Sequence, residues 1–221
     1  MMHLKNYVKA ETLVDLEEVL MKSFKITVLV LVFVVGCLFF QFNHALASPA
    51  QEQLKTTIDK LLKTLKDPDL KGDTQTAQRR DALRNVINER FCFAKMSQLS
   101  LARHWKKRSA EEKEVFIKLF GQLLEETYVS KIETYTDEKI AYGKEVVKKN
   151  KAKIYTKVIT DSLEIPIDYS MYKTKQGSWM VYDLVIEGVS LVGNYRSQFS
   201  KILEKDSYEA LLEVLKKKLD K

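Results

Sequence analysis

The sequence predicts an α+β domain in which one curved antiparallel sheet of about four strands is wrapped by helices. Three observations support this fold class. Apolar residues recur at helical spacing in the first half of the chain, from residue 51 to residue 135. They alternate with polar residues between 151 and 160, as in a strand with one buried face, and further strand-like segments follow up to residue 186 before helical spacing returns after Ser190. Helices, then strands, then helices again are typical of α+β domains.

Three helices are expected before residue 106. Residues 51–65 carry leucines and isoleucines every three or four positions, and Asp67-Pro68 ends that helix. Residues 80–91 form a second helical stretch through Leu83 and Ile87, and residues 95–105 form a shorter third. Each of these helices presents one apolar face to a core.

The longest predicted helix starts at Ser109 and runs to about Tyr135. Ser109 and Glu112 form a capping box, in which each side chain accepts a hydrogen bond from the backbone amide of the other. The apolar face of this helix is broader than a single flat contact needs. It comprises Phe116, Leu119, Phe120, Leu123, Leu124, Tyr128, Ile132 and Tyr135.

The strands are expected at 139–147, 151–160, 165–171 and 179–186, with a turn at Gln176-Gly177. The strand at 179–186 is apolar on both faces, so both faces must be covered, by protein or by a bound apolar ligand. Asp183 is its exception and is expected to share a face with Trp179, Val181 and Val185. A buried carboxylate needs a partner, either Arg196 or backbone amides near Glu187-Gly188.

Two helices complete the predicted domain. Gly188 supplies a left-handed turn after the strand, and Ser190 caps a helix carrying Val192, Tyr195, Phe199 and Ile202. Asp206 and Glu209 are expected to cap the last helix.

The N-terminal region predicts export. Residues 21–47 carry two lysines, an apolar run of 15 residues and Ala-Leu-Ala, the pattern of a cleaved signal peptide. Residues 1–20 contain four acidic residues and are interpreted as an upstream extension before a start at Met21. A lipoprotein anchored through Cys37 is the alternative. The mature chain, 48–221, is then a single domain in the periplasm.

Composition excludes several function classes. The formal charge is +7 with or without residues 1–47, which in an exported protein favours anionic lipid over nucleic acid as partner. Cys92 and His104 are the only cysteine and histidine of the mature chain, too few for a disulfide or a Cys/His metal site. No catalytic motif occurs, so we expect no enzyme, catalytic residue, metal or cofactor.

Residues 179–190 resemble the W-x-V-Y-D-(apolar)₃-E-G-V-S signature of the MlaC, or toluene-tolerance, family of periplasmic phospholipid carriers. Residues 93–135, with Met96, Trp105 and Thr127-Tyr128, and residues 194–199 resemble the family's helices in the same order. Two positions differ from the family pattern: Cys92 stands where relatives often have an acidic residue, and Ala110 stands where many have proline.

The resemblance implies an apolar pocket between sheet and helices that holds phospholipid acyl chains as cargo, with the headgroup near the mouth. It implies transfer between an outer-membrane lipoprotein–porin complex and an inner-membrane ABC transporter with an MCE-domain protein, which maintains outer-membrane lipid asymmetry. The residues expected to line the pocket are Val189, Val181, Val185, Tyr128 and Ile132, and then Phe120, Leu124, Ile165, Ile167, Val192 and Tyr195. Alternatives are a periplasmic lipid hydrolase using Asp183 or His104, and a structural domain that binds a partner but no lipid.

Overall fold

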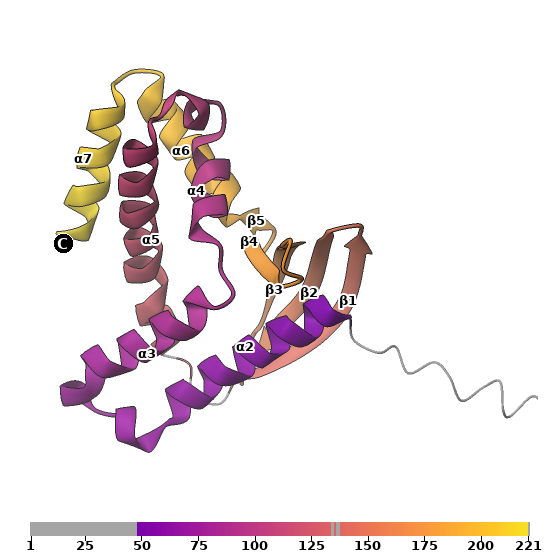
Figure 1. Ribbon diagram of the computed structural model, residues 1–221. Helices are drawn as coiled ribbons and strands as arrows, with labels where there is room; N and C mark the ends of the chain where they lie inside the picture. Colours follow the sequence, from indigo (N-terminus) through magenta and orange to yellow (C-terminus); the bar gives the residue numbers. More distant parts are fainter. Residues whose placement is uncertain (1–47, 134, 136–137, 221) are drawn as a thin grey trace, which may run out of the picture. The chain divides into compact units, whose positions relative to one another are not determined.

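The computed structural model describes residues 48–133, 135 and 138–220 (Figure 1). The predicted extension, the signal peptide and Cys37 lie outside these residues. The helices are α2 (Pro49–Lys66), α3 (Thr76–Asn88), α4 (Phe93–Leu101), α5 (Ala110–Glu133), α6 (Leu191–Leu203) and α7 (Tyr208–Leu219). The strands are β1 (Lys139–Lys148), β2 (Lys151–Ile159), β3 (Glu164–Lys173), β4 (Trp179–Ile186) and β5 (Val189–Ser190). Within the described ranges, no helix has the length and apolar character needed to cross a bilayer.

The strands form one open antiparallel sheet in the order β1-β2-β3-β4-β5, which confirms the predicted α+β class. The four predicted strands are present, and β5 adds two residues beside the end of β4. Beside the start of β4, Cys92 donates its amide to the Val181 carbonyl at 2.9 Å, and the Val181 amide donates to the Arg90 carbonyl at 2.8 Å. The β4 edge is therefore paired along most of its length.

A β-bulge in β4 corrects the predicted strand face. Val181 pairs with Met171 but Asp183 pairs with Ser170, so Tyr182 is an extra residue between them. One extra residue moves all later side chains to the opposite face. Asp183 and Val185 therefore lie on the face opposite Val181, and the prediction that they share its face was wrong.

Two hydrophobic cores stabilise the domain, one among helices and one on the sheet. The helical core lies among α4, α5, α6 and α7, which pack beside one another (Figure 1). The sheet core forms where Ala50, Leu54 and Ile58 of α2 cover the sheet face that carries Ile154 and Val181. Phe91 and Leu184 pack against both cores and so join them.

The predicted long helix and most predicted caps are confirmed, but α3 starts four residues before the predicted stretch 80–91, and α4 ends at Leu101, four residues before the predicted end at 105. The capping box that starts α5 is present, with the Glu112 amide donating to Ser109 Oγ at 3.1 Å and the Ser109 amide to Glu112 Oε2 at 2.6 Å. Ser190 caps α6 by accepting from the Gly193 amide at 2.9 Å. The last helix is capped by Ser207, which accepts from the Ala210 amide at 3.1 Å, so the prediction of Asp206 and Glu209 was wrong.

Candidate functional site

One row of side chains crosses the sheet on the face that α2 partly covers. Cross-strand pairing places its members side by side, since directly opposed residues point to the same face. From β5 to β1 the row is Val189, Ile186, Ile167, Thr156 and Tyr142. Its three aliphatic members belong to neither core, and Val189 is 59% exposed. Ile167 and Ile186 are half-buried, so this end of the sheet face is apolar and only partly covered by protein.

Ile165 extends the same partly covered surface. It pairs with Val158 and lies two residues from Ile167 on β3, so it points to the same face. We refer to Ile165, Ile167, Ile186 and Val189 as the open sheet face. Leu163, in the turn before β3, lies two residues before Ile165 and is 63% exposed.

The predicted pocket residues divide into three groups. Val189, Ile165 and Ile167 lie on the open sheet face, while Val185 is half-buried on the opposite face. Ile132 is half-buried near the end of α5. The other predicted residues lie in or against the cores: Phe120, Leu124, Val192 and Tyr195 in the helical core, Tyr128 against it, and Val181 in the sheet core. A lipid-contacting role for any of them stays a prediction.

An aromatic network closes the helical core. The Phe120 ring meets Tyr195 edge-on with centroids 5.0 Å apart, and Phe199 with centroids 5.4 Å apart. Phe116 packs edge-on against Phe199 at 5.6 Å and stacks near Phe120 at 5.7 Å. Such geometry adds to the stability gained by burial, so this core is built as a tightly packed interior.

Asp183 holds the start of α6. Its carboxylate accepts from Ser190 Oγ at 2.6 Å and from the Val192 amide at 3.0 Å. A carboxylate at a helix N-terminus satisfies free backbone amides and complements the helix dipole. Of the two predicted partners, Arg196 instead donates from Nε to the Leu99 carbonyl at 2.8 Å, so that pairing was wrong. The other prediction, a backbone amide near Glu187-Gly188, was right in kind, but the amide is that of Val192.

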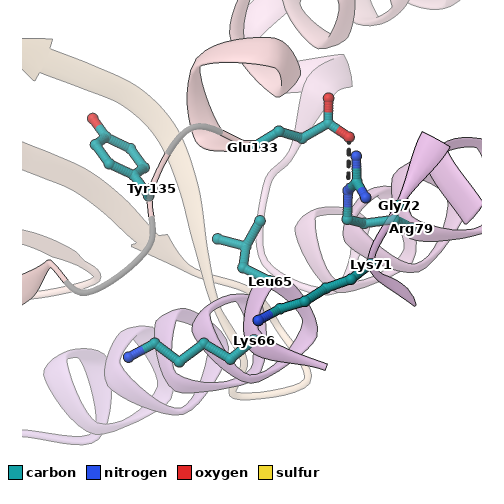
Figure 2. A pocket seen from close by; sticks show the side chains of 7 residues that line it. All are labelled: Leu65, Lys66, Lys71, Gly72, Arg79, Glu133 and Tyr135. Atoms are coloured by element: carbon teal, nitrogen blue, oxygen red, sulfur yellow. Dashed lines mark hydrogen bonds and ion pairs between the residues drawn. The ribbon is translucent and has the colours of Figure 1, made fainter. Parts of the chain in front are cut away.

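A cavity of 410 Å³ lies where α2 ends, α5 ends and the chain leads into α3 (Figure 2). Its lining consists of Leu65, Lys66, Lys71, Gly72, Arg79, Glu133 and Tyr135. Arg79 Nε donates to Glu133 Oε1 at 3.0 Å, and Arg80 binds the other oxygen at 3.1 Å. The Glu133 hydrogen bond and charge raise the pKa of Arg80. The cavity wall therefore carries more positive than negative charge.

The sequence does not predict this cavity, because its charged residues come from distant segments. Arg79 and Glu133 are 54 positions apart, and lysines near helix ends are usually solvated. The adjacent arginines at 79 and 80 were the only local signal.

Three tyrosines at the end of α5 and on the sheet influence one another's pKa. Tyr135 lines the cavity, and in Figure 2 it extends away from the Arg79–Glu133 pair. Burial raises the pKa of Tyr169 on β3, and the nearby Tyr135 raises it further. Burial also raises the pKa of Tyr142, with Tyr169 as the next contributor. The Tyr142 hydroxyl is buried and has no hydrogen-bond partner among the described residues.

The remaining reactive groups have local partners. Tyr172 donates its hydroxyl to Cys92 Sγ at 3.2 Å, and this bond together with burial raises the pKa of Tyr172 to about 12. His104 accepts from Arg103 Nε at 3.2 Å, and burial and the adjacent cations lower its pKa. In the described ranges, no group of three or more His, Cys, Asp or Glu side chains is placed to hold a metal ion.

An open antiparallel sheet partly covered by α2, a cluster of helices beside it and a partly exposed apolar sheet face define a small α+β domain. Comparison with known proteins places it more narrowly. The sequence profile described as MlaC protein matches residues 55–217. The chain belongs to the MlaC family.

Two relatives illustrate the family. The chain is 30% identical over 138 residues to the "Intermembrane phospholipid transport system binding protein MlaC" of Haemophilus influenzae. That match covers 60% of this chain and 63% of the relative's length. The chain also resembles the solved phospholipid-binding protein of Ralstonia solanacearum in complex with a phospholipid, with a TM-score of 0.71 and 26% identity. This structural match covers 77% of the chain and 97% of the Ralstonia protein.

Proposed function

We propose that the protein binds phospholipid through its acyl chains and carries the lipid between the two membranes of the cell envelope. The observation that carries this proposal is the open sheet face, where Ile165, Ile167, Ile186 and Val189 lie outside both cores. The likeness to a Ralstonia protein solved with a phospholipid supports the choice of ligand.

The physical need for a carrier supports the same function. Two acyl chains hold about 30 methylenes, and keeping each from water is worth about 0.8 kcal/mol. A phospholipid released into water would therefore face a barrier on the order of 20 kcal/mol. A protein surface that replaces most of this apolar contact removes most of the barrier. A surface only partly covered by the protein's own side chains suits this task.

The location and partners of the carrier follow from the predicted signal peptide and from the family. We place the mature protein in the periplasm. We assign as its partners an outer-membrane lipoprotein–porin complex and the MCE-domain protein of an inner-membrane ABC transporter. The name of the Haemophilus relative, which refers to an intermembrane transport system, supports this scheme.

The proposed carrier needs no catalytic group. Both relatives are named for binding or transport of phospholipid and not for a reaction. Asp183, considered for a hydrolase, is engaged by Ser190 and the Val192 amide at the start of α6. This engagement supports a structural role for the carboxylate.

Lipid extraction tests the proposal. Protein purified without detergent from bacterial periplasm should release phospholipid into organic solvent, detected by mass spectrometry at a constant ratio to protein. A folded sample whose extract holds no phospholipid, and which takes none up from vesicles, would contradict it.

A further inference from the structure

We propose that the end of the sheet formed by the β1–β2 and β3–β4 turns docks on a membrane surface rich in anionic phospholipid. Five exposed lysines make this contact, and we call them the basic sheet end: Lys148, Lys149, Lys151, Lys173 and Lys175. The inference goes beyond lipid carriage, because it concerns how the protein meets a membrane and not where it holds its cargo.

Strand pairing gathers these lysines at one end of the sheet. Lys148 of β1 pairs with Lys151 of β2, and Lys151 pairs in turn with Tyr172, the residue before Lys173 on β3. The Lys173 amide donates to the Asn150 carbonyl at 2.8 Å, which joins the two turns. Since neighbouring strands lie about 4.8 Å apart, the backbones of lysines on three strands lie within about 10 Å of one another. This separation is comparable with the screening length of about 10 Å at 0.1 M salt, so their potentials add.

Acidic residues do not balance this charge on either turn. Residues 148–151 and 173–178 contain all five lysines and neither aspartate nor glutamate. Among the described residues, none of the five side chains takes part in an ion pair or a hydrogen bond. By contrast, Lys153 further along β2 lies 3.1 Å from Asp168 Oδ2. Glu145 of β1 accepts hydrogen bonds from the amide and the hydroxyl of Ser48. The charge of the basic sheet end is therefore available to an external anionic surface.

The backbone at Lys149 supports a role for its charge. Lys149 and Asn150 form the two-residue turn between β1 and β2, and Lys149 has a φ of 54°. Side chains other than those of asparagine and aspartate rarely occupy this left-handed region, which glycine enters freely. The turn would form more easily with one of those residues, so its own geometry does not account for the lysine.

The kind of cation favours a membrane over a protein partner. All five residues are lysines, which are depleted in protein–protein interfaces, whereas arginine and aromatic residues are enriched there. Lysine carries a compact charge on a flexible stem, which suits mobile lipid headgroups. Lysine clusters next to a bilayer are attracted to anionic lipid in this way. Val147 precedes Lys148 and is 44% exposed, so it adds apolar surface beside the charges.

Docking through this end leaves the open sheet face accessible. Ile167 and Lys173 are six residues apart on β3, which corresponds to about 20 Å at about 3.3 Å per residue. The membrane contact and the lipid-binding surface therefore lie towards opposite ends of the same strand. Substitutions can change one without touching the other.

Vesicle binding by matched variants tests the proposal. Protein purified from the periplasm would be sedimented with phosphatidylcholine vesicles that either contain or lack phosphatidylglycerol. The test variant replaces four lysines of the basic sheet end: Lys148→Gln, Lys149→Asn, Lys173→Gln and Lys175→Gln. The control replaces four exposed lysines, one on each of four helices: Lys63→Gln, Lys118→Gln, Lys201→Gln and Lys217→Gln. Each set lowers the formal charge by four, from +7 to +3.

We expect the test variant to bind the phosphatidylglycerol vesicles at least about tenfold more weakly than the wild type, since each lysine near an anionic bilayer contributes to the attraction. The control should lose much less, because its charges are spread over the surface and screened. Arginine at the same four positions of the basic sheet end should preserve binding, since the charge is kept. The test variant should unfold at the wild-type denaturant concentration and release as much phospholipid on extraction as the wild type.

Three outcomes would overturn the proposal. The first is a wild type that does not bind the phosphatidylglycerol vesicles, and the second is an equal loss in the test and control variants. The third is wild-type retention on immobilised poly-glutamate, lost in the test variant, without vesicle binding by either, which would assign the basic sheet end to an acidic protein. A wild type that holds no extractable phospholipid but binds vesicles through these lysines would refute the carrier function and leave the docking surface standing.

Discussion

The helical core and the open sheet face are made of similar residues but differ in how they are closed. In the helical core, Phe116 and Phe120 have no exposed surface, and aromatic rings of α5 and α6 meet edge-on. On the open sheet face, isoleucines and a valine stand in register across three strands, yet neither core includes them. The apolar surface of the helical core is buried and stabilises the fold, whereas the open sheet face leaves apolar surface available to a ligand.

This contrast predicts that mutations in the two regions separate folding from binding. The largest effect is expected for Phe120→Ala, which removes a fully buried ring in contact with Tyr195 and Phe199. Truncation of a buried phenylalanine costs about 3–5 kcal/mol of unfolding free energy. Denaturant unfolding measures this loss, and a cost below about 1 kcal/mol would show that the helical core is not closed as described.

Asp183→Ala should have the next largest effect, because it leaves the start of α6 without its acceptor. Loss of a helix cap with a charge-assisted hydrogen bond costs about 1–3 kcal/mol. Asp161→Ala, at an exposed position in the β2–β3 turn, serves as control and should cost almost nothing. If Asp183→Ala kept full stability but abolished a phospholipid hydrolase activity in the wild type, the structural assignment would be wrong.

Tyr142→Phe should leave the free energy of unfolding unchanged or raise it by up to about 1 kcal/mol, since its hydroxyl is buried and finds no partner in the part of the chain that the structure describes. Tyr208→Phe is the matched contrast. It removes a hydroxyl that donates to the Glu112 carbonyl at 2.8 Å and should cost about 1 kcal/mol. Equal losses in both variants would indicate that the Tyr142 hydroxyl has a partner of similar strength in the lipid-free protein.

The last prediction concerns alkaline pH. Burial raises the pKa of Tyr208 to about 12, so the folded state favours the neutral phenol. The resulting stabilisation is complete below the ordinary tyrosine pKa of about 10 and is lost as the pH rises towards 12. The wild type should therefore lose more stability than Tyr208→Phe over this range in denaturant unfolding. Parallel losses would contradict a raised pKa at Tyr208.

The same contrast explains what sequence could predict. The alternation of apolar and polar residues correctly predicted β2, and apolar residues at helical spacing correctly predicted α5. Burial of one face imposes a period of two residues on a strand and of about 3.6 residues on a helix. Periodicity could not distinguish Phe120, which is closed in by other side chains, from Ile167, which is not, because both simply occupy the inner face. The bulge at Tyr182 was also hidden, and it moved Asp183 and Val185 to the other face. No local pattern signals an extra residue within an apolar run.

The charged cavity was beyond sequence reasoning for a different reason. Its wall combines the end of α2, the segment before α3, and the end of α5. Only the packing of α3 near α5 brings Arg79 and Arg80 to Glu133. Side chains that come together only in the tertiary structure have no regular spacing in the sequence, so their contact cannot be predicted from it.

The central claim, that the open sheet face binds lipid and adds little to stability, is tested most directly by the lipid-to-protein ratio of Val189→Asp. Val115→Asp on α5 is the matched control, since Val115 is 44% exposed and Val189 is 59% exposed. Both variants should unfold at the wild-type denaturant concentration. We predict that Val189→Asp, purified without detergent, loses its extracted phospholipid while Val115→Asp retains it. Wild-type lipid content in Val189→Asp would contradict the account.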